Sequence, residues 1–142
     1  MNIVKGILSI VGGIVAGSIV NGCIIILSFA ILGPAGINLF DAESFKANAD
    51  KFTAANFAGT WLAHQLGTFV GAFVAAKIAP DRKMLSAISV GIWFLLGGIY
   101  AATIVSAPIW YLVADIALYI PVAYLAGKLG SARRNAAVPA TA

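Results

Sequence analysis

Apolar positions fall into four long runs separated by short polar segments. One run, at about 57–79, reads FAGTWLAHQLGTFVGAFVAAKIA, and the others cover about 3–32, 85–105 and 108–128. At about 1.5 Å per residue, each run is long enough to cross a bilayer as an α-helix. Short connections join neighbouring helices in opposite directions. The pattern therefore predicts an all-α transmembrane fold, an antiparallel four-helix bundle.

Composition places the chain among membrane proteins. Hydrophobic residues make up 61% of its 142 positions and charged residues only 10%, against about 25% charged in soluble domains. The mean hydropathy of +0.99 agrees. The four runs leave no length for a soluble module, so we expect one transmembrane domain over 1–132. Residues 133–142 show no apolar periodicity and are expected to form a disordered cytoplasmic tail.

The segment 37–56, between the first and second spans, is the only sizeable polar stretch. Asp41 is suited to cap the N-terminus of a helix, and Phe45, Ala49 and Phe52 then fall on one helical face. This spacing predicts a short amphipathic helix that lies on the membrane surface or caps the bundle. A solvated turn without helical structure is the alternative.

The first run also has features of a cleaved signal. Val20–Cys23 resembles a lipoprotein cleavage box, but Asn21 fits poorly there and the apolar run continues past Cys23. A mature lipoprotein would turn polar after the cysteine, so we expect an uncleaved helix. It should end at Gly33–Pro34, since glycine and proline together do not continue a helix.

The basic residues segregate by side. With four spans, one side holds Lys5, Lys77, Arg82, Lys83, Lys128, Arg133 and Arg134. The other side holds only Lys46 and Lys51. The positive-inside rule therefore predicts a multi-pass protein with both termini in the cytoplasm. The net charge of +4 belongs to this topology, and we expect no nucleic-acid partner.

Small residues recur at helical spacing on three of the runs, as on membrane helices that pack closely. The glycines predicted to pack against neighbouring helices are Gly13, Gly17, Gly67, Gly71, Gly91 and Gly98. Each stripe needs a neighbour, within the chain or in another copy.

Polar residues are expected to meet inside the membrane. His64 lies thirteen residues before Lys77, and Asp115 lies thirteen before Lys128, so both sit about 20 Å from the basic end of their helices. The predicted cluster consists of His64, Asp115, Asn21, Gln65 and Tyr119. Two interpretations stay open, a structural pair between helices and a site that relays a proton or binds a small polar solute.

The sequence offers little for catalysis. One histidine with one buried carboxylate is too small a set for a metal site, and Cys23 is the only cysteine. No serine or cysteine stands in a nucleophile motif. We therefore predict a protein that is not an enzyme and has no metal or other cofactor.

The runs LAHQLGTFVGAFVAAKIAPDRKM, GIWFLLGGIYA and YIPVAYLAGKLG, the turn at Pro108–Tyr111 and the beginning MNIVKGILSIVGGIVAG resemble a family of small bacterial four-span membrane proteins. Its members generally carry no assigned function. The resemblance implies a bacterial inner membrane and an uncleaved first helix. We expect a structural or accessory component that acts as a homo-oligomer or with a larger membrane protein. The alternative is a small oligomeric transporter or channel for a proton or small polar solute, using His64 and Asp115.

Overall fold

The computed structural model describes residues 3–132, and within this range the chain is helical with no strand. The predicted tail at 133–142 lies outside the described residues. In chain order the elements are α1 (Ile3–Leu32), α2 (Ala42–Ala47), the 3-10 helix η1 (Ala49–Lys51), α3 (Ala54–Ile78), α4 (Lys83–Ile104) and α5 (Ile109–Ser131).

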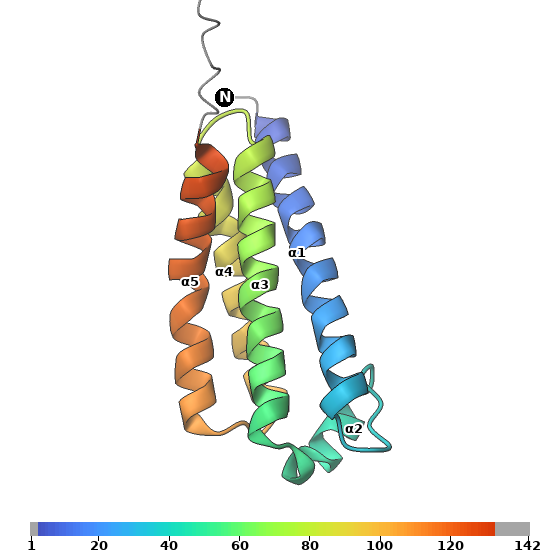
Figure 1. Ribbon diagram of the computed structural model, residues 1–142. Helices are drawn as coiled ribbons and strands as arrows, with labels where there is room; N and C mark the ends of the chain where they lie inside the picture. The colour runs from blue at the N-terminus through green and yellow to red at the C-terminus, as the bar shows by residue number, and fades with distance from the viewer. Residues whose placement is uncertain (1–2, 133–142) are drawn as a thin grey trace, which may run out of the picture.

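The four long helices lie side by side (Figure 1). The start of α1, the turn between α3 and α4, and the end of α5 lie together; we call this the N-terminal end. The opposite end, called the α2 end, holds α2 and the turn between α4 and α5. Helices α3 and α4 contact each other and both outer helices, whereas α1 and α5 make no contact within residues 3–132. The middle of the molecule is therefore the α3–α4 pair.

Helix α3 is the most enclosed element. Ten of its 25 residues are buried, against three of 30 in α1. Helices α1, α4 and α5 are long and apolar enough to cross a membrane, and α3 falls short in apolarity only. Its buried or half-buried polar side chains, such as His64, Gln65 and Thr68, lower its mean hydropathy. The sequence predicted that His64 and Gln65 meet a polar residue of another helix, and the structure places both against α5.

The first polar connection is built differently from the single helix predicted there. Helix α1 ends at Leu32, directly before Gly33–Pro34. The Asp41 side chain caps α2 as expected, accepting a hydrogen bond from the backbone N–H of Glu43 at 3.0 Å. However, α2 ends at Ala47 and η1 follows it, so the helical face does not run unbroken from Phe45 to Phe52.

Helix α3 begins at Ala54 rather than at the predicted Phe57. The Asn56 side-chain oxygen accepts from the Thr53 backbone N–H at 2.9 Å, and the Asn56 amide donates to the Leu32 carbonyl at 2.9 Å. These bonds satisfy backbone groups that the ends of α1 and α3 leave without helical partners. The apolar pattern missed the first residues of α3 because the polar side chain of Asn56 interrupts it.

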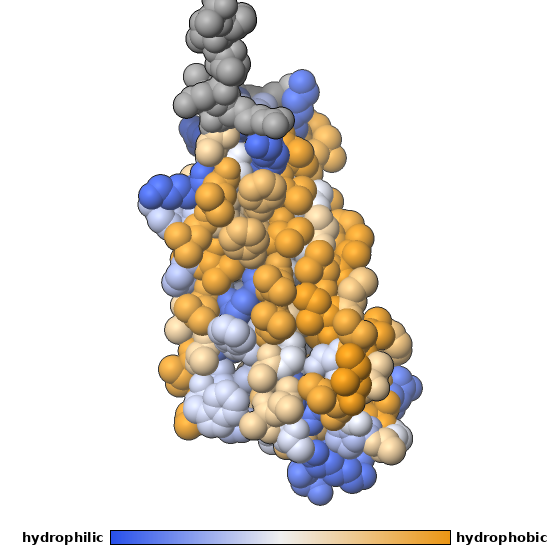
Figure 2. Space-filling view, viewed as in Figure 1, coloured by the Kyte–Doolittle hydropathy of each residue, from blue (hydrophilic) through white to orange (hydrophobic). Residues whose placement is uncertain are grey.

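The outer surface is predominantly apolar. Figure 2 shows hydrophobic residues along most of the length of the long helices, hydrophilic residues mainly at the two ends, and a small hydrophilic patch between them. Leu27, Leu96 and Leu125, on three different helices, are exposed in this way. An apolar surface of this extent is typical of contact with lipid.

The core of the half toward the N-terminal end is made of small side chains. Its fully buried members are Ala72, Ala75, Ala76, Ala87, Val90, Ala123 and Ala126. Side chains of this size let helix backbones approach closely. This half is therefore filled by backbone contact and contains little free space.

The predicted packing glycines other than Gly98 lie at such close approaches, and Gly98 lies against the ring of Tyr119. A Cβ atom at Gly13 would lie 2.5 Å from the carbonyl oxygen of Gly71, and one at Gly17 the same distance from that of Gly67. A Cβ at Gly91 would meet Ala123, on α5. Atoms at such distances overlap, so α1, α3, α4 and α5 hold this spacing only with glycine at these positions.

Candidate functional site

A buried carboxylate joins α3 to α5. Asp115 Oδ2 lies 2.9 Å from His64 Nδ1 and accepts from the Tyr119 hydroxyl at 3.0 Å. Gln65 Nε2 donates to the other oxygen, Oδ1, at 3.1 Å. The Asp115 side chain is only 4% exposed. Both carboxylate oxygens are therefore hydrogen-bonded inside the protein.

The local sequence explains how these four side chains meet. His64 and Gln65 are neighbours on α3, so they approach the two oxygens of one carboxylate from adjacent helical positions. Tyr119 lies four residues after Asp115 and therefore on the same face of α5. The 2.9 Å contact between His64 and Asp115 agrees with the equal depths predicted for them.

The hydrogen bonds of the cluster explain how a carboxylate can be buried here. A charged carboxylate in an apolar environment is costly unless it is paired and hydrogen-bonded. Asp115 has three side-chain partners, Gln65, Tyr119 and His64. This saturation makes a buried aspartate stable there, and it ties two helices together.

Asn21 is not hydrogen-bonded to this cluster. Its side-chain oxygen is buried and has no hydrogen-bond partner among residues 3–132. It lies on α1 against α3, where a Cβ at Gly67 would be 2.8 Å from the Asn21 Cβ. Asn21 and His64 do line one hollow together, along with residues of α4 and α5. The predicted cluster included Asn21, but a position along the helix axis does not determine the direction of a side chain.

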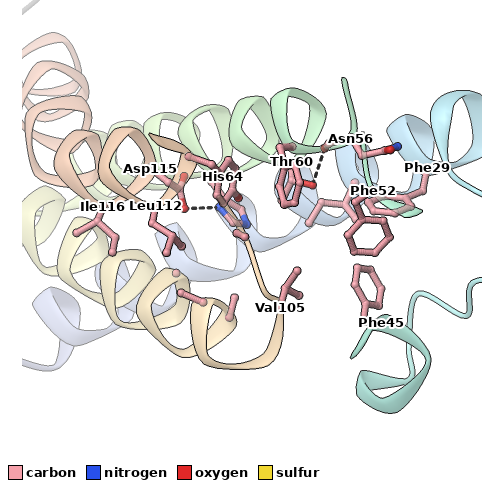
Figure 3. A pocket seen from close by; sticks show the side chains of 17 residues that line it. Phe29, Phe45, Phe52, Asn56, Thr60, His64, Val105, Leu112, Asp115 and Ile116 are labelled. Carbon is pink, nitrogen blue, oxygen red and sulfur yellow. Dashed lines mark hydrogen bonds and ion pairs between the residues drawn. The ribbon is translucent and has the colours of Figure 1, made fainter. Parts of the chain in front are cut away.

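A cavity of about 170 Å³ opens on the other side of the cluster, toward the α2 end. His64 and Asp115 line its inner part, and most of its wall comes from apolar residues of all four long helices. Figure 3 shows the imidazole of His64 beside this space, with Nδ1 directed toward Asp115. The cluster is therefore not sealed in the core but forms the polar floor of an apolar cavity.

Aromatic side chains from distant parts of the sequence gather at the outer part of this cavity. The ring centroids of Phe29, Phe45 and Phe52 lie 5.5 to 5.7 Å from one another. Phe57 extends this group, 6.1 Å from Phe52 and 5.2 Å from Tyr111. These separations are in the range for attractive aromatic pairs. The group fixes α2 and η1 against the bundle and forms one wall of the cavity.

Sequence reasoning missed two kinds of polar contact. The Ser9 hydroxyl lies 3.2 Å from that of Ser86 and links α1 to α4 in the half of small side chains. The Thr60 hydroxyl, on the cavity wall, donates to the Asn56 carbonyl at 3.1 Å. Ser9 lies four residues before Gly13 and therefore on the same face of α1. A hydroxyl on a packing stripe was the available signal.

Within the described residues, no group of three or more His, Cys, Asp or Glu side chains is arranged to hold a metal ion. The four side chains of the cluster supply one carboxylate, one imidazole, one amide and one phenol. The cluster itself includes no serine, threonine or cysteine, and the hydroxyl of the neighbouring Thr68 donates to the backbone carbonyl of His64 at 2.8 Å. Hydrogen bonding and proton exchange are the chemistry that the cluster offers. Comparisons with family models, with curated proteins and with solved structures find no match for this chain.

Proposed function

We propose that the chain crosses a bacterial inner membrane four times, as an antiparallel bundle, with both termini in the cytoplasm. Three observations support α3 as the fourth span. It has 25 residues, it lies alongside three helices that are each apolar enough to span (Figure 1), and it packs against all of them. Enclosure of this kind allows a helix with polar residues to cross hydrocarbon, since these residues face protein.

We further propose that the protein is a non-enzymatic structural or accessory component of the membrane. The observation that carries this proposal is the saturated Asp115 carboxylate, bonded to His64 and Gln65 of α3 and to Tyr119 of α5. A carboxylate with this set of partners acts as a clamp between helices. The partners of the protein as a whole would be a second copy of the chain or a larger membrane protein, together with the surrounding lipid.

Transport is the second candidate, and the cavity that reaches His64 favours it. Between His64 and the N-terminal end, however, the core consists of closely packed alanine and glycine. The buried hydroxyls of Ser9 and Ser86 are bonded there. A path for a proton or small polar solute would therefore have to form between copies in an oligomer or by separation of these helices.

Reporter fusions test the topology. A reporter after Lys83 or after Lys128 should report cytoplasm, and one after Ala47 should report the periplasm, because the basic residues segregate by side. Alkaline phosphatase and green fluorescent protein, active on opposite sides, serve as a matched pair of reporters. Phosphatase activity at Lys83 would contradict the four-span arrangement.

Affinity purification of the tagged chain from native membranes, with mass spectrometry, tests the role. A stoichiometric membrane-protein partner would support the accessory role. A homo-oligomer that also raises proton or solute flux in reconstituted vesicles would contradict that role and support transport. In that case Asp115→Asn should abolish the flux, since it replaces the only carboxylate of the cluster by an uncharged amide.

A further inference from the structure

His64 has one ring nitrogen engaged and one available. The other two side chains that contact Asp115, Gln65 Nε2 and the Tyr119 hydroxyl, are donors. Asp115 is therefore the acceptor of the cluster, so in a neutral imidazole the hydrogen lies on His64 Nδ1. Nε2 then presents a lone pair, and it has no hydrogen-bond partner among residues 3–132. The floor of the cavity offers one acceptor.

Asn56 and Thr60, on the cavity wall, are bonded within the protein, whereas the Tyr111 hydroxyl has no hydrogen-bond partner among residues 3–132 and is a second free polar group beside the ring. The Asn56 amide donates to the Leu32 carbonyl, and its oxygen accepts from Thr53. The Thr60 hydroxyl donates to the backbone of Asn56. A polar solute with several hydrogen-bonding groups would find few partners here, and burying those groups would be costly.

The cavity has the size and the lining for one ring. Its volume is about 170 Å³, and an engineered apolar cavity of about 150 Å³ in another protein binds benzene. Phe29, Phe45, Phe52 and Tyr111 supply aromatic edges and faces to its wall. Figure 3 shows the labelled phenylalanines on one side of the space and His64 with Asp115 on the other.

We propose that this cavity binds a small monocyclic phenol, with the ring among the aromatic side chains and the hydroxyl donating to His64 Nε2. A phenolic O–H matches a lone acceptor, whereas an aromatic hydrocarbon leaves that acceptor unpaired. A quinone carbonyl provides no hydrogen to donate. The site is separate from the proposed clamp, because it uses the ring nitrogen that the clamp does not use.

Fluorine NMR titration of the purified chain in detergent tests the proposal with two probes, 4-fluorophenol and fluorobenzene. They differ by one hydroxyl and share a ring that fits the cavity. We expect 4-fluorophenol to bind about three- to tenfold more tightly, the factor that one neutral hydrogen bond supplies. Equal affinity for the two probes, or no binding of either, would overturn the proposal.

A pair of variants locates the binding. Ala102 lines the cavity, and Ala102→Phe should fill it and abolish binding of both probes. Ala117 is exposed on α5 and is not part of the cavity wall, so Ala117→Phe should bind both probes as the unsubstituted chain does. The pair also corrects for partition of the probes into detergent. Unchanged binding by Ala102→Phe would place the ligand elsewhere and refute the proposal.

The acceptor is tested by His64→Phe, which keeps a ring of similar size but removes both nitrogens. The preference for 4-fluorophenol should disappear while fluorobenzene still binds. A preference that persists in this variant would contradict the role of Nε2. If the loss of the contact with Asp115 prevents folding, the comparison of the two probes on the unsubstituted chain decides the matter. A negative result leaves the clamp untouched, since fusions and purification test that role separately.

Discussion

The two halves of this bundle are packed by different means. In the half toward the N-terminal end, glycine and alanine bring backbones into contact, as where a Cβ at Gly71 would lie 2.7 Å from the Gly13 carbonyl oxygen. In the half toward the α2 end, large aromatic rings and the polar cluster lie between the helices, and a cavity of about 170 Å³ remains beside them. The first half stabilises the fold by close contact between helices. The second half holds the ionisable side chains, His64 and Asp115.

The difference teaches where a small membrane protein can hold an ionisable group. Charge is costly in hydrocarbon, and the cost falls when partners are fixed nearby. Asp115 lies where the side chains of His64 and Gln65 reach it between α3 and α5. In the half of small side chains the helices are too close to admit a cluster of this size. The closely packed half therefore holds in place the helices that carry the polar cluster in the other half.

The largest expected effect comes from Gly71→Leu. Its new side chain would meet the backbone of α1 at Gly13 and the side chain of Val90, and neither the backbone nor a fully buried residue can move away easily. We expect a loss of unfolding free energy above the usual ~1–3 kcal/mol of overpacking, measured by denaturation in mixed micelles.

Gly97→Leu is the matched control for that change. Gly97 is exposed on α4, and a Cβ there would meet no heavy atom within 4 Å. The same substitution should therefore change stability little. Equal losses of unfolding free energy for the two variants would mean that the contact between α1 and α3 does not hold the bundle together. The two halves would then not differ in how they are packed.

The second prediction concerns the polar cluster. Asp115→Leu leaves the donors of His64, Gln65 and Tyr119 without their acceptor, and we expect a cost of about 2–3 kcal/mol, the upper part of the range for unsatisfied buried groups. Asp115→Asn retains one side-chain oxygen and should cost less. Unfolding in detergent measures both.

A double-mutant cycle with His64→Leu isolates the pair. Replacing both members of a buried pair by apolar side chains is often close to neutral. The double variant should therefore recover part of the loss seen with Asp115→Leu. A coupling energy of zero would show that the contact contributes nothing to stability, and the proposed clamp would have to be abandoned.

Much of this arrangement could be predicted from the sequence, because it follows from periodicity. Long apolar runs predicted the long helices, and the equal depth of His64 and Asp115 predicted their contact. Glycines at helical spacing indicated which faces of α1 and α3 pack closely, although not against which neighbour. In each case a residue's position along its helix carried the information.

The cavity and its aromatic wall could not be predicted in this way. Phe29, Phe45 and Phe52 belong to three separate segments, and their meeting depends on how the chain folds back after α1. The early start of α3 depends on the hydrogen bonds of Asn56, which an apolar pattern does not contain. The contact between Ser9 and Ser86 likewise needs the rotation of two helices about their axes, and depth along the axis does not give that rotation.

The smallest expected effect compares two alanines on α4. Ala87 is fully buried, and a Cβ at Gly127 would lie 2.7 Å from the Ala87 Cβ. Ala102 lines the cavity. Ala87→Leu should cost about 1–2 kcal/mol, within the usual range for overpacking. Ala102→Leu should be neutral or raise stability by up to about 1 kcal/mol, since it places methylene groups in empty space.

The difference between these variants is the most direct measure of the contrast between the halves. Both replace alanine by leucine on one helix, so helix propensity and exposure of the unfolded chain cancel between them. Unfolding midpoints in one detergent at one protein concentration give the sign. If Ala102→Leu destabilised as much as Ala87→Leu, both halves would be equally filled. The cavity would then be too small or too rigid to admit even a leucine side chain, and so also too small for a ring.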